Sequence, residues 1–170
     1  MSLAFPSLPP ALLQLHQTLG VPPDYPARHR LPFHPEADEN QLVEIGRTDE
    51  DRPIRLLAPA AAAWTNLRLA AAADGITLIP ISGFRSIARQ AEIIQRKMAA
   101  GEASADIFRY VAAPGFSEHH SGRALDIASP EHIVAILEPE IQEEGTIDPL
   151  IVSRDVFDPQ GHVLQSVAQY

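Results

Sequence analysis

Apolar residues that recur every three or four positions predict the helices of this chain. In the segment 86–99, isoleucine, alanine and methionine residues repeat at the spacing of one helical face. The segment 59–74 is rich in alanine, begins with a proline and is followed by Gly75, which are start and stop signals for a helix. On such grounds we predict helices over residues 9–19, 59–74, 86–99 and 104–111.

Short runs of β-branched and aliphatic residues predict strands. The runs 42–45 and 54–57 flank a charged turn, so we expect them to pair as a hairpin. The compact run 76–81 favours a buried strand, and 124–128 forms a further strand after a polar loop. Between residues 21 and 40 five prolines interrupt any period, and we expect that stretch to wrap the surface as irregular chain.

The order of these elements favours an α+β fold, with helices packed on a small, mainly antiparallel sheet. The length of 170 residues is that of one ordinary domain. We therefore expect a single domain over 1–170. It would consist of an irregular N-terminal wrap with a short helix (1–40), a motif-bearing core (41–130) and a divergent acidic tail (131–170).

The net charge of −9 disfavours nucleic acid as a partner, because binding to the phosphate backbone depends on a surplus of Lys and Arg. Most of this charge lies in the segment 131–170, where eight acidic residues stand against Arg154 alone. The mean hydropathy of −0.06 is that of a globular protein, and we expect no insertion into a membrane. The oligomeric state stays open.

The chain has no cysteine, which excludes disulfides, thiolate zinc sites and thiol nucleophiles. Any metal would be bound by histidine and carboxylate side chains. His119 and Asp126 lie seven positions apart, across a loop that leads into a strand, so both side chains can turn toward a common point. Imidazole nitrogen and carboxylate oxygen suit a cysteine-free zinc site. A surface hydrogen bond between the two residues is the alternative.

Two motifs give these residues a context. The segment 114–127, PGFSEHHSGRALDI, contains the pattern Ser-x-His-x-x-Gly-x-Ala-x-Asp, formed by Ser117, His119, Gly122, Ala124 and Asp126. The segment 82–90, SGFRSIARQ, places Arg85 at a strand-to-helix junction and Gln90 on the following helix. An arginine there can hold a peptide carboxylate or a developing oxyanion. The alternatives are a structural ion pair for Arg85 and a solvent-facing position for Gln90.

Both motifs resemble those of the VanY-type zinc D-alanyl-D-alanine carboxypeptidases, in which the arginine segment reads Ser-Gly-Tyr-Arg-Ser and Phe84 replaces the tyrosine. The resemblance implies a VanY/VanX/Hedgehog-like fold and the cleavage of peptidoglycan stem peptides or muropeptides with Zn²⁺. It implies that His119 and Asp126 are zinc ligands. It also implies that Ser117, Arg85 and Gln90 bind the substrate, and that Arg85 takes part in catalysis.

The last part of the family pattern is missing. The family ends in a Glu-Pro-Trp-His box that supplies the general base and the third zinc ligand, and this chain lacks it. A catalytic zinc needs three protein ligands and an open water position. Of the histidines that follow the motif, His132 and His162, the second is the better candidate because it follows a proline-glycine turn and enters an apolar run. A surface-loop histidine is the alternative. In the family the general base lies three residues before this histidine. Here Pro159 occupies that position, so the carboxylate is missing.

We therefore expect a zinc-dependent D-alanyl-D-alanine carboxypeptidase. A catalytically incomplete member that binds muropeptides or a protein is the alternative, and an interaction domain that uses the acidic tail is a third possibility. The sequence does not distinguish cleavage of a D,D peptide bond from cleavage of an L,D bond, because this specificity depends on pocket walls that the fold assembles. The resemblance implies the periplasm or cell envelope. The N-terminus shows no signal peptide, so a cytoplasmic location is the alternative.

Overall fold

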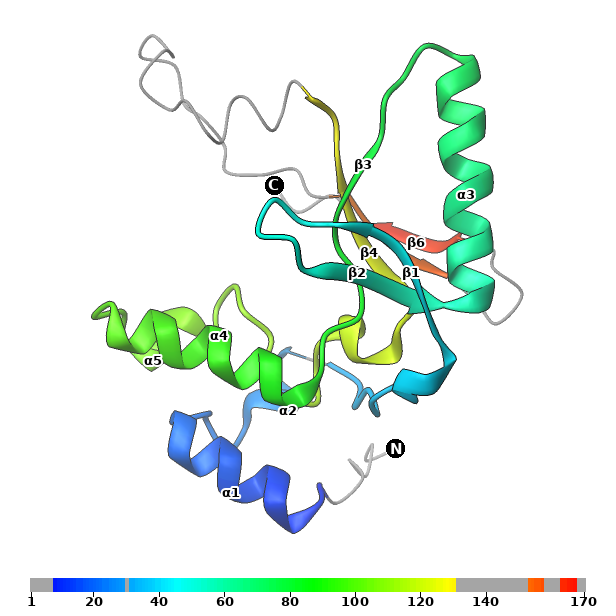
Figure 1. Ribbon diagram of the computed structural model, residues 1–170. Coiled ribbons are helices and arrows are strands. Elements are labelled where there is room, and N and C mark those ends of the chain that lie inside the picture. The colour runs from blue at the N-terminus through cyan, green and yellow to red at the C-terminus, as the bar shows by residue number, and fades with distance from the viewer. Residues whose placement is uncertain (1–7, 30, 131–152, 158–162, 168–170) are drawn as a thin grey trace, which may run out of the picture. The chain divides into compact units, whose positions relative to one another are not determined.

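The computed structural model divides the chain into two compact units that alternate along the sequence (Figure 1). The structure describes residues 8–29, 31–130, 153–157 and 163–167. The first unit, which we call the helical unit, consists of Met1–Glu36 and Arg85–Ser121. The second, the sheet unit, consists of Ala37–Phe84 and Gly122–Tyr170. The expectation of one domain over the whole chain stays a prediction.

Short helices make up the described part of the helical unit. They are α1 (Pro10–Leu19), α2 (Tyr25–His29), α4 (Ile87–Ala99), α5 (Ser104–Ile107) and the 3-10 helix η2 (Glu118–Ser121). Helix α1 ends at Gly20, whose φ of 67° is the left-handed conformation that closes many helices. Helix α4 begins after Ser86, whose side chain accepts a hydrogen bond from the Arg89 N–H at 3.0 Å. Helices α4 and α5 pack side by side (Figure 1).

An apolar core that is rich in aromatic rings stabilises the helical unit. Tyr25, Phe108 and Phe116 are buried, and the ring centroid of Tyr25 lies 5.7 Å from that of Phe108 and 5.8 Å from that of Phe116. The Tyr25 hydroxyl accepts a hydrogen bond from the Ala113 N–H at 3.1 Å, so this buried oxygen has a partner. The other buried members of this core are Leu19, Ala91, Ile94, Ile107 and Ala113.

The sheet unit contains a hairpin, a helix and a separate antiparallel sheet. Its described elements are the 3-10 helix Glu39–Gln41, β1 (Leu42–Arg47), β2 (Pro53–Leu57), α3 (Ala58–Ala73), β3 (Ile79–Ser82), β4 (Ala124–Ala128), β5 (Ser153–Phe157) and β6 (Val163–Val167). Strands β1 and β2 pair with each other. The remaining strands form an antiparallel sheet in the order β3-β4-β5-β6.

Helix α3 contacts both strands of the hairpin (Figure 1) and carries the largest side chain of the sheet unit's core. Trp64 is buried against Leu56 of β2 and Leu125 of β4, both of which are also buried. Small side chains at Ala60 and Ala61 let the helix backbone approach the strands closely. Full burial of a large apolar side chain contributes about 1.5–3 kcal/mol. The alanine content of this helix therefore serves packing as well as helix propensity.

The predicted α+β class, with helices and a mainly antiparallel sheet, is confirmed. The hairpin is confirmed, and so are the helices expected over 9–19, 59–74 and 86–99, within one or two residues at each end. The strand expected at 124–128 is also present. Among the described residues, no helix is long and apolar enough to cross a membrane.

Three expectations were wrong in detail. The stretch 21–40 is not wholly irregular, because Tyr25 begins the short helix α2 and lies buried in the core. The strand expected from residue 76 begins only at Ile79 and is half-buried, since β3 lies at the edge of its sheet. Helix α5 ends at Ile107, because the N–H groups of Arg109 and Tyr110 bond to carbonyls three residues back and tighten the chain into turns.

The turn at Gly115 gives a test of packing in the helical unit. Gly115 and Gly101 both have positive φ, 87° and 95°, so alanine at either position costs about 1–2 kcal/mol of backbone strain. A Cβ atom on Gly115 would lie 2.8 Å from Cδ2 of Leu12 and 3.0 Å from Cε2 of Phe33, whereas no described atom lies within 4 Å at Gly101. We expect Gly115→Ala to lower the free energy of unfolding by about 1–3 kcal/mol more than Gly101→Ala in urea denaturation. Equal losses would contradict this packing.

The buried His16 gives a test of pH dependence. Burial lowers the pKa of His16, and the hydrogen bond from its Nε2 to the Pro114 carbonyl at 2.7 Å offsets this only in part. Below the unfolded pKa of about 6.5 the unfolded chain binds the extra proton, so stability is full above that pH and falls as the solution becomes more acidic. His16→Gln should reduce this slope of the unfolding free energy between pH 7 and 5, by at most about 1.4 kcal/mol per pH unit. His29→Gln, at an exposed position, is the control for the exchange of a histidine, and equal slopes in the two variants would contradict the prediction.

Candidate active site

Arg85 is held by Gln90 in the helical unit. Nη1 of Arg85 donates a hydrogen bond to Oε1 of Gln90 at 3.0 Å, and Nε2 of Gln90 donates to the Ala112 carbonyl at 2.6 Å. Gln90 is 1% exposed, so the alternative that it faces solvent from the helix surface is wrong. Both ends of its amide bond to other groups of the protein. The contact with substrate that the resemblance implies for Gln90 stays a prediction.

The backbone of Arg85 connects the two sequence motifs. Its N–H donates a hydrogen bond to the His119 carbonyl at 3.1 Å, and its own carbonyl lies 2.6 Å from Nδ1 of His120. Residues 35 positions apart in sequence are thereby fixed beside each other within one unit. The structure brings together Arg85, Gln90 and the segment that contains Ser117 and His119.

His120 is fully buried and makes two hydrogen bonds with the backbone. Its Nε2 accepts from the Gly115 N–H at 3.0 Å, and therefore Nδ1 carries the proton and donates to the Arg85 carbonyl. Burial lowers the pKa of His120 below its ordinary value, which favours the neutral ring that these bonds need. Residues Glu118–Ser121 form a 3-10 helix, in which the His120 N–H bonds to the Ser117 carbonyl at 3.1 Å.

Ser117 and His119 are buried in the helical unit. Ser117 is 2% exposed, and His119, on the 3-10 helix η2, is fully buried. Buried polar side chains of this kind are costly unless they are bonded or functional. Their burial and their place beside Arg85 make this segment the centre of the candidate site.

Asp126 lies on β4 in the sheet unit, at the register position between Ser82 of β3 and Arg154 of β5. It is half-buried. The motif's glycine, Gly122, has a φ of 66°, and a Cβ atom there would lie 3.1 Å from Leu42 and Leu57. Glycine at this position therefore has a structural reason, since the left-handed backbone conformation and the close approach both disfavour a side chain.

The third predicted metal ligand, His162, lies outside the described residues, as does His132. Among the residues that the structure describes, no three His, Asp or Glu side chains form a group that could hold a metal ion. His119 belongs to the helical unit and Asp126 to the sheet unit. The metal site that the sequence predicts stays a prediction.

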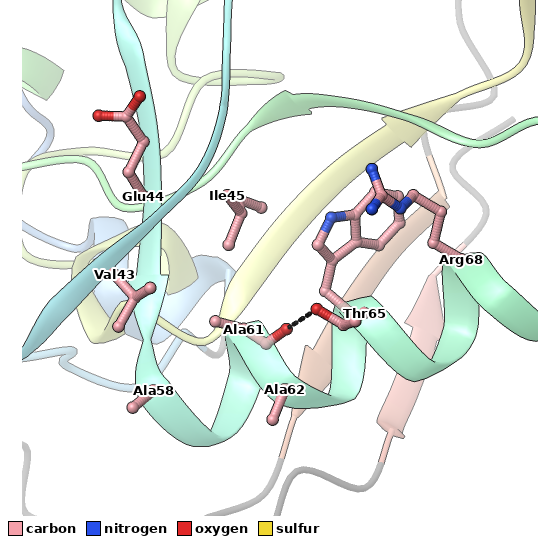
Figure 2. A pocket seen from close by; sticks show the side chains of 9 residues that line it. Val43, Glu44, Ile45, Ala58, Ala61, Ala62, Thr65 and Arg68 are labelled. Atoms are coloured by element: carbon pink, nitrogen blue, oxygen red, sulfur yellow. Dashed lines mark hydrogen bonds between the residues drawn. The ribbon is translucent and has the colours of Figure 1, made fainter.

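A pocket of about 380 Å³ lies in the sheet unit between β1 and α3 (Figure 2). Within it, Oγ1 of Thr65 donates a hydrogen bond to the Ala61 carbonyl at 3.0 Å. Its lining residues are Val43, Glu44, Ile45, Ala58, Ala61, Ala62, Trp64, Thr65 and Arg68. Neither motif contributes to this lining, so the pocket is separate from the candidate site residues.

Sequence reasoning passed over His120 as a functional residue. The signal for it in the sequence is the pair of adjacent histidines at 119 and 120, of which only His119 was given a role, as a zinc ligand. The bonds of the second ring go to Gly115 and Arg85, and the latter is 35 residues away. A contact of that separation is set by the fold and leaves no periodic pattern in the sequence.

The buried amide of Gln90 gives a stability test with a matched control. Gln90→Leu removes the bonds to Arg85 and to the Ala112 carbonyl, and it should lower the free energy of unfolding by about 1–3 kcal/mol. Gln95→Leu, on an exposed face of the same helix, should change it by less than about 0.5 kcal/mol. Urea denaturation of both variants measures the difference. A Gln90 variant as stable as the Gln95 variant would show that these bonds add little.

Known proteins resemble this chain in its central part. The family model for VanY, D-alanyl-D-alanine carboxypeptidase, matches residues 53–152. A D-alanyl-D-alanine carboxypeptidase of Enterococcus faecalis (strain ATCC 700802 / V583) is 41% identical over 34% of this chain and 25% of its own length. The chain therefore spans about a quarter of that relative.

Two solved structures are also similar. VanYB in complex with D-alanine-D-alanine is 26% identical, with 64% of this chain and 65% of that chain covered and a TM-score of 0.45. A variant of the D,D-pentapeptidase VanY in complex with Zn(II) is 26% identical, with 63% and 66% covered and a TM-score of 0.42. The family match spans more than half of this chain and includes both motifs, 82–90 and 114–127. The chain belongs to the VanY family of D-alanyl-D-alanine carboxypeptidases.

Proposed function

We propose that this chain is a zinc-dependent D-alanyl-D-alanine carboxypeptidase that removes the terminal D-alanine from peptidoglycan stem peptides or muropeptides. The observation that carries the proposal is the hydrogen bond from the Arg85 N–H to the His119 carbonyl at 3.1 Å. It joins the two motifs within one unit and sets a cationic side chain beside the segment of the proposed metal ligand. Membership of the VanY family supports the reaction class.

Arg85 and Ser117 are proposed to bind the carboxylate of the terminal D-alanine. A guanidinium presents five N–H donors in a fixed plane, which suits two parallel bonds to a carboxylate. The bond to Gln90 restricts the rotation of that plane, so less conformational entropy is lost when substrate binds. Ser117, which is buried in the same unit, would add a hydroxyl donor.

His119, Asp126 and His162 are proposed as the protein ligands of Zn²⁺. The donor types fit, because a chain without cysteine can offer only imidazole nitrogen and oxygen ligands to this metal. Of the histidine doublet, His120 uses both ring nitrogens on backbone groups, so His119 is the ring assigned to the metal. Bound zinc would polarise the scissile carbonyl and lower the pKa of a bound water.

The general base is proposed to come from a carboxylate outside the family's usual position. The candidates are Glu118, Glu138 and Glu140. Glu118 is the one that lies in the described part of the chain, at the start of η2. Burial raises the pKa of Tyr25, the hydrogen bond from the Ala113 N–H opposes this, and the negative charge of Glu118 adds a smaller increase. Without a base to move the proton of the attacking water, hydrolysis would be slow.

A binding protein for muropeptides is the second candidate function. The absence of the Glu-Pro-Trp-His box favours it, because the elements proposed to hold the substrate carboxylate lie in the helical unit and do not need that box. In either case the partner is a peptidoglycan peptide. We place its action in the cell envelope, with recycled muropeptides in the cytoplasm as the alternative.

The first experiment measures D-alanine release from a stem pentapeptide by zinc-loaded protein. His119→Ala, Asp126→Ala and His162→Ala should each lower kcat/KM by about 1,000-fold or more, because a catalytic zinc needs all three ligands. His29→Ala, which replaces an exposed histidine of α2, should leave kcat/KM unchanged.

The outcomes separate the candidates. Full activity of His162→Ala would remove that residue from the proposed ligand set. If the parent protein releases no D-alanine but binds the dipeptide D-alanyl-D-alanine, and Arg85→Ala loses that binding, the binding function is the correct one. If it neither cleaves nor binds, both candidate functions are wrong.

A further inference from the structure

Three hydrogen bonds fix Arg85 at both its backbone and its side chain. The N–H is bonded to the His119 carbonyl, the carbonyl to Nδ1 of His120, and the guanidinium to Gln90. Two of these bonds involve residues of the second motif. The position of the Arg85 backbone is therefore determined by contacts with η2, in addition to its place at the start of α4.

His120 is the only side chain among these partners that bridges two backbone groups. Its ring accepts from the Gly115 N–H and donates to the Arg85 carbonyl, at 3.0 and 2.6 Å. The ring is fully buried, so water cannot replace either bond. One neutral imidazole thus connects the turn at Gly115 with Arg85, two residues before the start of helix α4.

A second buried histidine holds the same turn without contacting Arg85. Nε2 of His16 donates to the Pro114 carbonyl at 2.7 Å, one residue before Gly115. His16 and His120 are 7% and 0% exposed, and burial lowers the pKa of each. Both residues are therefore buried histidines, and each bonds to a backbone group of the same turn, at Pro114 for His16 and at Gly115 for His120. They differ in that the bonds of His120 reach Arg85.

We propose that His120 is a positioning residue, which places the guanidinium of Arg85 for the carboxylate of the substrate by holding the Arg85 carbonyl to the turn at Gly115. This inference rests on the proposed function, in which Arg85 binds the terminal carboxylate. His120 contacts neither substrate nor metal in this role. It acts only through the backbone of Arg85, and the bond from Gln90 then orients the guanidinium.

The kinetic test compares His120→Leu with His120→Gln. Leucine removes both bonds, whereas a glutamine amide can still donate at one atom and accept at the other. A carboxylate contact that is present in ground and transition states affects KM, so His120→Leu should raise KM by about 10- to 100-fold and change kcat by less than about 3-fold. His120→Gln should restore KM to within about 3-fold of the parent.

His16→Leu is the matched control for loss of stability. It also removes a buried ring and a bond to the turn, so it should lower the melting temperature as His120→Leu does. Below the melting temperature of both variants it should leave KM unchanged. A folded His120→Leu protein whose KM equals that of the parent overturns the inference, and so does a KM raised equally by His16→Leu.

A second readout does not need catalysis. The Nε–Hε signal of Arg85 in ¹⁵N NMR spectra, assigned by its loss in Arg85→Lys, reports the order of the guanidinium in the substrate-free protein. We expect His120→Leu to shift and broaden this signal, and His120→Gln and His16→Leu to preserve it. If the parent protein releases no D-alanine, the proposed carboxypeptidase function is wrong. The Arg85 Nε–Hε signal then still tests whether His120 positions Arg85. An Arg85 signal that His120→Leu leaves unchanged overturns the inference.

Discussion

The hydrogen bond between the Arg85 N–H and the His119 carbonyl is the contact on which the arrangement of the candidate site depends. It is possible because helix α4 begins two residues later, at Ile87 after the Ser86 cap, so that the amide of Arg85 is not used within the helix. The same bond places η2 beside the start of α4. Ser117 and His119, in this segment, are both buried. The helical unit therefore presents its cationic side chain and its buried polar segment together.

Burying so many polar groups in one small unit requires that each has a bonding partner. Gln90 bonds at both ends of its amide, and His120 bonds at both nitrogens of its ring. An unsatisfied buried group costs about 1–3 kcal/mol, a large part of the stability of a small protein. The apolar core around Tyr25 and Phe116 supplies burial energy beside this network. Position and stability at the site thus depend on the same contacts.

The proposed tasks are divided between the units. Arg85, Ser117 and Gln90, which are assigned to the substrate, belong to the helical unit, whereas Asp126 belongs to the sheet unit and His162 lies outside the described residues. The divergence of this chain from its family pattern falls in the C-terminal segment, which contains His162. Substrate binding can therefore be retained in a member whose hydrolytic step is altered. For this reason we consider two functions for the same residues, a carboxypeptidase and a binding protein.

The sequence by itself determined the helices with strong periodicity or alanine content, the hairpin, the α+β class and the family, because these depend on local spacing and on motifs within short segments. Only the tertiary structure decided that Gln90 is buried against Arg85, that β3 is a half-buried edge strand, and that His120 bonds to Arg85. Each of these depends on which distant segments meet. Residues 35 positions apart carry no common period, so their contact follows from the packing of the whole unit.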